Sequence, residues 1–318
     1  MIAKRKNCTR TTISIYMSKG IIILGNGFDL DLGLKTSYAD FAKSEFWQDL
    51  MADNSHSTNS QRLLGFLKGK YDVEKWIDIE AALLEYALDK TENHRISNAE
   101  EDKEDYTQLC QALKQYLIEQ QNNYVPSPIS VARGLVGSLK SMTNASKLYT
   151  FNYTQLDVLA LKLNVRLGYD AVHIHGSLMD EGNLILGIDT NKTINESYSF
   201  LYKTQNRQYR HTEILKDLRD KDEYIFFGHS LNGMDYSYFK SLFSILANTN
   251  LSTPRLTIIA KNEDDENRFK NFLRKEYISL PALYSNSIPT FILTDEVYNK
   301  NESERKKVQD LLERLQVM

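Results

Sequence analysis

The sequence predicts an α/β fold, in which a mostly parallel sheet carries a large all-helical insertion after its first strand–helix turn. An aliphatic run at 21–24 leads directly into Gly-Asn-Gly, as a buried strand leads into a tight turn. The next hundred residues, about 37–145, repeat apolar side chains at spacings of three and four, which is typical of helices. Beyond them, short β-branched and aromatic runs alternate with helical segments, which favours strands buried on both faces.

The segment before the first strand, residues 1–19, is expected to form a disordered or strained arm. It is basic but has no long apolar stretch, so it does not have the features of a signal peptide. Translation could begin at Met1 or at Met17, because the ordered pattern begins just after the second methionine.

From residue 20 to 318 we expect one α/β domain, with the insertion inside it. The insertion is expected to hold five helical segments, separated by polar breaks. These segments are 37–52, 61–71, 73–90, 105–124 and 129–142. The later strands are expected at 147–153, 171–176, 183–188, 223–229, 255–261 and 290–294.

Composition excludes several classes of protein. The net charge is −3, so no general attraction to nucleic acid or to an anionic membrane is expected. The two cysteines, Cys8 and Cys110, lie far apart, which argues against a thiolate zinc site and favours a reducing compartment such as the cytoplasm. The apolar runs are too short to span a bilayer.

The turn after the first strand is the first candidate binding element. Gly25 and Gly27 let the backbone turn tightly and approach a ligand, and a helix beginning here would attract an anion. The match to a dinucleotide-binding motif is imperfect, because Leu30 stands where that motif has its third glycine. Asp29 and Asp31 also stand where a phosphate is expected. An ordinary strand-to-loop turn explains the glycines equally well.

Polar residues follow two further predicted strands. Asn152 ends the second strand, where an amide must find partners or face a cleft, whereas Thr154 and Asp157 have the spacing of a helix cap. His173 and His175 alternate along the third strand, and Gly176 then permits close approach to the second histidine. A metal site here lacks an apparent third ligand.

The fourth strand ends in Gly228-His229-Ser230, where Gly228 and Ser230 could hold a ribose or a phosphate, or where the chain could form an ordinary βα loop. Asp235 is expected to cap the next helix. In the insertion, Trp76 and Glu80 have the spacing of one helix face, so Glu80 either reaches the crevice or is exposed beside a core tryptophan. Since ligands of open α/β sheets lie beyond the carboxyl ends of the strands, the strand-end residues predict one shared crevice.

Five motifs together resemble the AbiH family of bacterial phage abortive-infection proteins. They are GNGFDLDLGLKTSYADF, WIDIE, TFNYTQLD, HIHGS and FGHSLNGMD, and they follow the order of the family between residues 21 and 239. The resemblance implies a bacterial, cytoplasmic defence protein, and the pattern W-x-x-x-E that contains Glu80 recurs in the family.

The same order of motifs is more distantly similar to sirtuin-like defence proteins that hydrolyse NAD, which implies a Rossmann-like (sirtuin-like) sheet. By position, the resemblance implies that Gly25 and Gly27 approach the dinucleotide. It implies that Asn152 and His175 flank the nicotinamide ribose. The full set implied to contact the nucleotide is Gly25, Asn26, Gly27, Phe28, Thr36, Gly228, Ser230 and Asp235, with Glu80 and Asp157 as further candidates.

Two departures from the sirtuin pattern matter for chemistry. The chain lacks the four-cysteine zinc module of protein-deacylating sirtuins, and Asp29 replaces a small hydroxyl residue. We therefore expect an effector that hydrolyses the nicotinamide–ribose bond of NAD or a related nucleotide, with NAD as substrate and no permanent cofactor. Asn152, His175 and Asp29 are the expected catalytic residues.

A non-catalytic module that senses a nucleotide and binds a partner is the alternative function. In either case a phage-derived trigger or assembly into a homo-oligomer is expected to control the protein. Neither a membrane nor nucleic acid is expected as a partner. NAD binding without turnover would favour the sensing module.

Overall fold

A computed structural model describes residues 19–52, 61–74, 78–93, 98–142, 146–182, 184–189, 192–209, 211–219, 221–231, 235–248, 253–316 and 318. The expected N-terminal arm, apart from Lys19, lies outside these residues. Trp76, which the sequence pairs with Glu80 on one helix face, also lies outside them.

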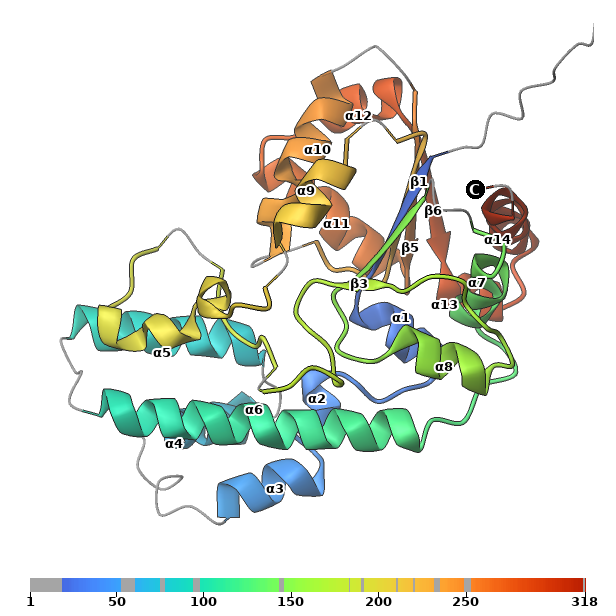
Figure 1. Ribbon diagram of the computed structural model, residues 1–318. Coiled ribbons are helices and arrows are strands. Elements are labelled where there is room, and N and C mark those ends of the chain that lie inside the picture. The colour runs from blue at the N-terminus through green and yellow to red at the C-terminus, as the bar shows by residue number, and fades with distance from the viewer. Residues whose placement is uncertain are drawn as a thin grey trace, which may run out of the picture.

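The central element is a six-stranded, all-parallel sheet, which confirms the predicted α/β fold (Figure 1). Its strands are β1 (Gly20–Leu24), β2 (Lys147–Thr150), β3 (Val172–His173), β4 (Glu223–Phe227), β5 (Arg255–Ala260) and β6 (Ile288–Leu293). The spatial order is β3-β2-β1-β4-β5-β6, which is the order of a Rossmann-like doubly wound sheet. In such a sheet the strand order reverses between β1 and β4.

Helices cover both faces of the sheet, because alternate residues of each strand point to opposite sides (Figure 1). Ile21 and Ile23 of β1 pack toward one helical layer, and Ile22 and Leu24 pack toward the other. The first layer holds α9 (His211–Asp217), α10 (Tyr236–Asn248), α11 (Glu263–Lys275) and α12 (Leu280–Asn286). The second holds α1 (Asn26–Leu32), α7 (Val131–Leu139), α8 (Leu156–Lys162), α13 (Thr294–Tyr298) and α14 (Glu302–Leu315).

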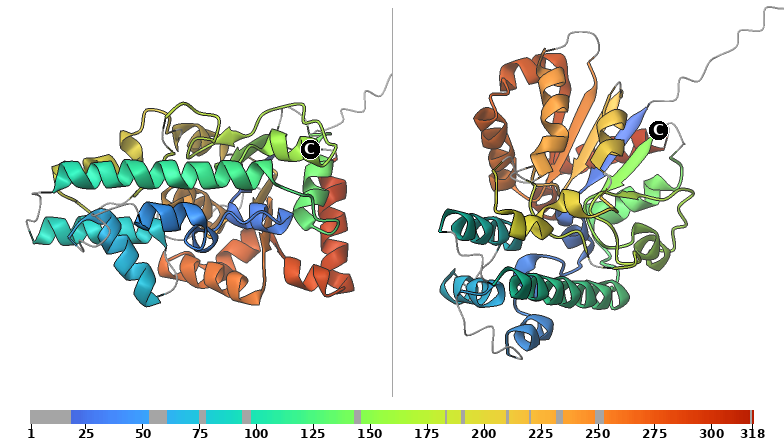
Figure 2. Two further views of the ribbon diagram at one scale, coloured as in Figure 1. Left: turned by 90° about the horizontal axis from the view of Figure 1, so that it is seen from below. Right: turned by 60° about the vertical axis from the view of Figure 1, so that its left-hand side comes forward.

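A helical block lies across the carboxyl end of the sheet, as the views of Figures 1 and 2 show. Its helices are α2 (Tyr38–Phe41), α3 (Glu45–Ala52), α4 (Leu63–Glu74), α5 (Ile79–Glu92) and α6 (Ala99–Asn122). Together with α1 and α7 they account for all the regular structure that is described between β1 and β2. The block has a hydrophobic core of its own, separate from the cores on the two faces of the sheet.

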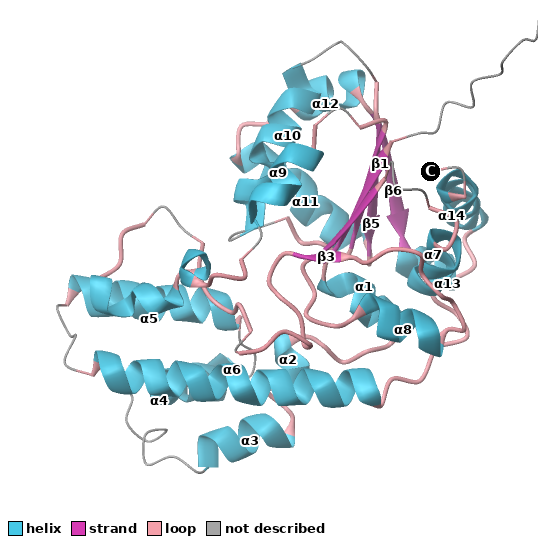
Figure 3. Cartoon of the chain, in the orientation of Figure 1, coloured by secondary structure: helices cyan, strands magenta, loops and turns pink. Residues whose placement is uncertain are grey.

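The prediction of a strand at 183–188 is wrong. The described part of this segment, together with the chain up to α9, is mostly loop with two short 3₁₀ helices, η1 (Glu196–Leu201) and η2 (Lys203–Gln205) (Figure 3). A single bridge joins Ile188 to Tyr202. Leu184, Leu186 and Ile188 are buried in the core of the helical block, so their apolar character reflects packing there and not in the sheet.

The described part of the chain contains no helix that is both long enough and apolar enough to cross a membrane.

Candidate functional site

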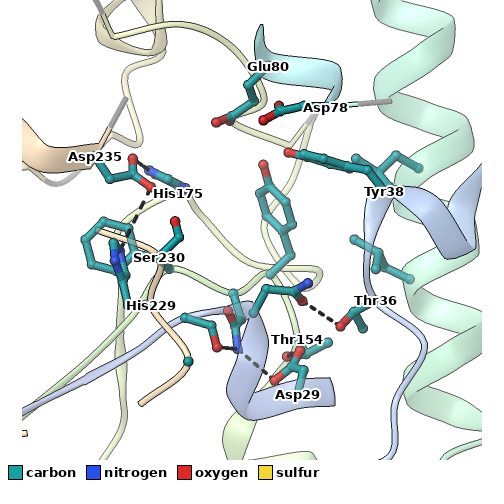
Figure 4. Close-up of a pocket in the computed structure, with 18 of the residues that line it drawn as sticks. Asp29, Thr36, Tyr38, Asp78, Glu80, Thr154, His175, His229, Ser230 and Asp235 are labelled. Atoms are coloured by element: carbon teal, nitrogen blue, oxygen red, sulfur yellow. Dashed lines mark hydrogen bonds and ion pairs between the residues drawn. The ribbon is translucent and has the colours of Figure 1, made fainter. Parts of the chain in front are cut away.

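A cavity of about 320 Å³ opens where the strands end, between the sheet and the helical block (Figure 4). Leu24 pairs with Thr150 on one side and with Phe227 on the other, so the residues that follow three strands meet here. This point lies between β1 and β4, where ligands of doubly wound sheets bind. The lining residues are Gly25, Asn26, Asp29, Thr36, Tyr38, Asp78, Glu80, Ala81, Leu113, Leu117, Phe151, Asn152, Tyr153, Thr154, His175, Gly228, His229, Ser230 and Asp235.

The glycines of the first turn are required by contacts within the protein. A Cβ on Gly27 would lie 2.6 Å from the Cα of Gly228, and a Cβ on Gly25 would lie 2.6 Å from the Cα of His229. Gly228 has a φ of +61°, which favours glycine. Two turn N–H groups are also used internally, because Gly25 N donates to Phe227 O and Gly27 N donates to Gly228 O, both at 2.9 Å.

Asp29 lies at the floor of the cavity and is 1% exposed. Its carboxylate accepts hydrogen bonds from Asn152 Nδ2 at 2.7 Å and from Thr154 Oγ1 at 2.6 Å. Burial raises the pKa of Asp29 to about 7, although these two hydrogen bonds oppose the shift. Asn152 Nδ2 also donates to Gly25 O at 3.1 Å, so the amide joins β2 to the turn after β1.

Thr154 was expected to cap a helix, and this expectation is wrong. The N-cap position of α8 is Gln155, which makes no side-chain capping bond, and the Thr154 hydroxyl is bound to Asp29. A second threonine hydroxyl bonds to α1 close by, because Thr36 Oγ1 donates to the side-chain amide oxygen of Asn26 at 2.6 Å. Both hydrogen bonds hold the helix α1 against neighbouring chain segments at the cavity wall.

His175 and Asp235 contact each other in the opposite wall. His175 is 5% exposed, and its Nε2 lies 3.1 Å from Asp235 Oδ1. Asp235 directly precedes α10, as expected of a cap, but its carboxylate is directed to the histidines of the cavity (Figure 4). Burial alone would raise the pKa of Asp235, but Lys203 and His175 hold it well below the usual value.

Lys203 links this wall to the helical block. Its side chain is fully buried, and Nζ lies 3.0 Å from Glu80 Oε1, 3.2 Å from Asp235 Oδ1 and 3.4 Å from His175 Nε2. Burial alone would lower the pKa of Lys203, but Asp235 and Glu80 raise it above its usual value. Burial also raises the pKa of Glu80, although the Lys203 ammonium opposes this shift.

His229 completes the cluster behind Asp235. Its Nδ1 accepts a hydrogen bond from Leu231 N at 3.0 Å, and its Nε2 lies 4.0 Å from Asp235 Oδ2. Burial lowers the pKa of His229 to about 4, although Asp235 opposes the shift. This histidine is therefore neutral at physiological pH.

Of the residues that were expected to be catalytic or to contact the nucleotide, three do not line the cavity. Gly27 packs against Gly228, Phe28 is buried against Phe227 in the core, and Asp157 is exposed on α8. His173 also lies outside the lining, with Nδ1 3.0 Å from Asn152 O.

Several residues of the site were not assigned a role from the sequence. They are Lys203, Tyr38, Asp78, Tyr153 and His229. His229 lies within a motif already considered, and its position between two small strand-end residues could have marked it. A buried lysine in a polar loop segment carries no such signal, because its partners come from distant parts of the chain.

The described residues contain no group of three or more histidine, cysteine or acidic side chains arranged to hold a metal ion. The charged groups that line the cavity instead pair with protein donors and with Lys203. The site is thus a partly enclosed crevice that combines a histidine–carboxylate pair with a buried amide and a buried carboxyl.

Comparison with known proteins identifies a matching family. A family model described as Bacteriophage abortive infection AbiH matches residues 21–255. The match contains every residue that lines the cavity. No curated protein matches the chain.

Proposed function

The chain belongs to the AbiH family of bacteriophage abortive infection proteins, and from this premise we propose that it acts in phage defence by hydrolysing the nicotinamide–ribose bond of NAD or a related nucleotide. The observation that carries the proposal is the pairing of His175 with Asp235 in the wall of a cavity at the switch point of a Rossmann-like sheet. A histidine–carboxylate pair of this kind can take up a proton.

In the proposed reaction, water attacks the ribose carbon that bears nicotinamide, and the C–N bond breaks with its electrons going to the nicotinamide ring. The leaving group departs as neutral nicotinamide, so it needs no strong acid. The water gives its proton to His175, and the other product is ADP-ribose. The transition state carries positive charge on the ribose, as in glycoside hydrolysis.

Hydrogen bonding supports the role of His175 as the base. Its Nε2 lies within bonding distance of Asp235 Oδ1, so we assign the proton to Nε2 and basicity to Nδ1. The Asp235 carboxylate orients the ring and stabilises the imidazolium that forms. Lys203 in turn fixes the carboxylate.

Asn152 and Asp29 have different proposed roles. The Asn152 amide nitrogen is occupied by Gly25 O and Asp29 Oδ1, which leaves its side-chain oxygen to orient the water or the carboxamide of the substrate. Each carboxylate oxygen of Asp29 already accepts a hydrogen bond from the protein. We therefore propose that Asp29 acts on the ligand chiefly by positioning Asn152 and Thr154.

The test is direct. Purified protein is incubated with NAD while nicotinamide release is followed, and cells that express wild type or Asn152→Ala are assayed for NAD before and after phage challenge. We expect nicotinamide release and phage-dependent NAD loss with wild type only. The proposal fails if wild type leaves NAD intact in both assays. NAD binding with no turnover in either assay would identify a nucleotide-sensing module instead.

A further inference from the structure

The cavity is lined by acidic side chains, which is unusual for a site that binds a dinucleotide. There are four, namely Asp29, Asp78, Glu80 and Asp235, and they lie on opposing walls (Figure 4). Among the described residues, no lysine or arginine lines the cavity. A site that binds pyrophosphate normally supplies cationic groups or unpaired backbone N–H groups.

Lys203 does not cancel this negative charge. Its ammonium is buried behind the wall, where it contacts Glu80 and Asp235, so one positive charge faces two carboxylates. Asp78 accepts a hydrogen bond from Ala81 N at the start of α5, and its side chain lines the cavity. The cavity therefore favours a cationic ligand over an anionic one.

The turn after β1 does not supply a phosphate site either. Gly25 N and Gly27 N are hydrogen-bonded to carbonyls at the end of β4, so they are not available to a ligand. Asp29 occupies the first turn of α1, where a Rossmann-type site holds its pyrophosphate. A phosphate placed there would meet a carboxyl group in place of a cation, and the ionised form of Asp29 would repel it.

The size and the aromatic lining agree with one nucleoside. About 320 Å³ is near the lower limit of ligand pockets, which span roughly 300–1,000 Å³. Tyr38, Phe151 and Tyr153 line the space, and aromatic rings attract cations.

We infer that the cavity selects the cationic nicotinamide riboside half of the dinucleotide and leaves the pyrophosphate and the adenosine outside. The inference rests on the proposed function for the identity of the ligand and adds what the site recognises. It follows that the positive charge of the pyridinium ring, and not the phosphates, gives most of the binding selectivity at this site.

The test compares three probes by calorimetry on the full-length protein. They are nicotinamide riboside, its neutral dihydro form and ADP-ribose. We expect the cationic nucleoside to bind at least about tenfold more tightly than the neutral form, because the two differ mainly in charge. ADP-ribose should bind more weakly than nicotinamide riboside.

Two variants test the origin of the selectivity. Asp78→Asn keeps a good N-cap residue while it removes one charge, and Glu80→Gln removes another. Each substitution should weaken the binding of nicotinamide riboside several-fold and leave the binding of the dihydro form nearly unchanged. The matched control is Glu85→Gln, on the same helix, where the side chain is 57% exposed and outside the cavity.

The inference is overturned if the neutral form binds as tightly as the cation, if ADP-ribose binds more tightly, or if nicotinamide riboside does not bind. Nicotinamide release from NAD is measured on the same protein, which separates the two proposals. Selective binding with no release would remove the proposed hydrolysis and keep the inference. Nicotinamide release together with equal binding of the charged and neutral probes would support the proposed hydrolysis and overturn the inference about charge selectivity.

Discussion

Asp29 and Asp31 stand two residues apart in α1 and have different structural roles. Asp29 is buried at the cavity floor, whereas Asp31 accepts hydrogen bonds from Ser130 Oγ at 2.9 Å and Ala132 N at 2.8 Å, and from the hydroxyl of Tyr298. Asp31 thus fastens α1 to the start of α7 and to α13. Of the two acids, only Asp29 lines the cavity.

Asp29→Asn should change how stability depends on pH. The pKa of Asp29 rises on folding from its ordinary 3.8 to about 7, so the folded state holds the proton more tightly than the unfolded state. This contribution to stability is complete below pH 3.8 and is lost as the pH rises toward 7. Between pH 3.8 and 7, the free energy of unfolding of wild type should therefore fall by up to about 4 kcal/mol relative to that of Asp29→Asn.

Urea unfolding of both proteins at several pH values between 4 and 8 measures this difference. A difference that stays constant across the range would show that Asp29 has no raised pKa in the folded protein.

His175→Ala should abolish most of the nicotinamide release. General base catalysis contributes typically about 10²–10⁴-fold, so we expect a loss of that order with the fold retained. Asp157→Asn is the control, because Asp157 is exposed on α8 and does not line the cavity. Steady-state rates and circular dichroism are measured for both. Full activity in His175→Ala would remove His175 from the proposed reaction.

At the scale of elements, the ends of β1 and β4 are joined by backbone groups in direct contact. Gly25 and Gly27 face Gly228 and His229 so closely that no side chain fits between them. The two glycines that resemble a dinucleotide-binding motif therefore have a structural role in this chain. They let two neighbouring strand ends approach and so bring the residues of the site together.

Gly27→Ala should destabilise the protein strongly, because its Cβ would lie 2.6 Å from the Cα of Gly228 and the backbone must move. We expect a loss of more than about 3 kcal/mol, measured by chemical denaturation. The matched control is Gly69→Ala in α4, where a Cβ meets nothing within 4 Å and alanine favours the helix by about 1 kcal/mol. Similar stabilities of the two variants would contradict this account.

Asp31→Ala should lower stability without altering the site. It leaves the first turn of α7 and the Tyr298 hydroxyl without their acceptor, which typically costs about 1–3 kcal/mol. Activity per folded molecule should equal that of wild type. Asp310→Ala, at an exposed position on α14, should change neither quantity. Loss of activity with normal stability would give Asp31 a role in the site.

At the scale of the whole molecule, the site exists because the helical block and the sheet meet. Glu80 lies in the helical block, His175 follows β3 and Asp235 follows β4. The ammonium group of Lys203 contacts the side chains of all three. The candidate site is therefore complete only when the block is packed against the sheet.

A double-mutant cycle measures this link. Lys203→Met should destabilise by about 3–5 kcal/mol, because it leaves two carboxyls without their buried partner. In the double variant Lys203→Met with Glu80→Gln, the loss should be smaller than the sum of the single losses. The pair Lys70 and Glu85 is the control, since it is partly exposed and should couple by less than about 1 kcal/mol. Additive losses at Lys203 and Glu80 would show that the two do not interact.

The sequence predicted the elements better than it predicted their contacts. Hydrophobic periodicity gave the parallel strands and the helical character of 37–145, since both depend on local pattern. It failed at 183–188, because an apolar run buried among helices resembles a strand. It also misassigned Thr154, since a local capping pattern cannot reveal a competing carboxyl more than one hundred residues away.

By itself the sequence determined the α/β class, the family and the strand ends at which the polar residues stand, because each follows from residue types that are close along the chain. Only the tertiary structure decided which of those residues share a cavity and what charge they present. In the folded protein, Asp31 bonds to α7 and the turn glycines pack against Gly228. The side chain of Lys203 is buried against Asp235. The reason is physical: burial and pairing of charges depend on neighbours that only folding brings together.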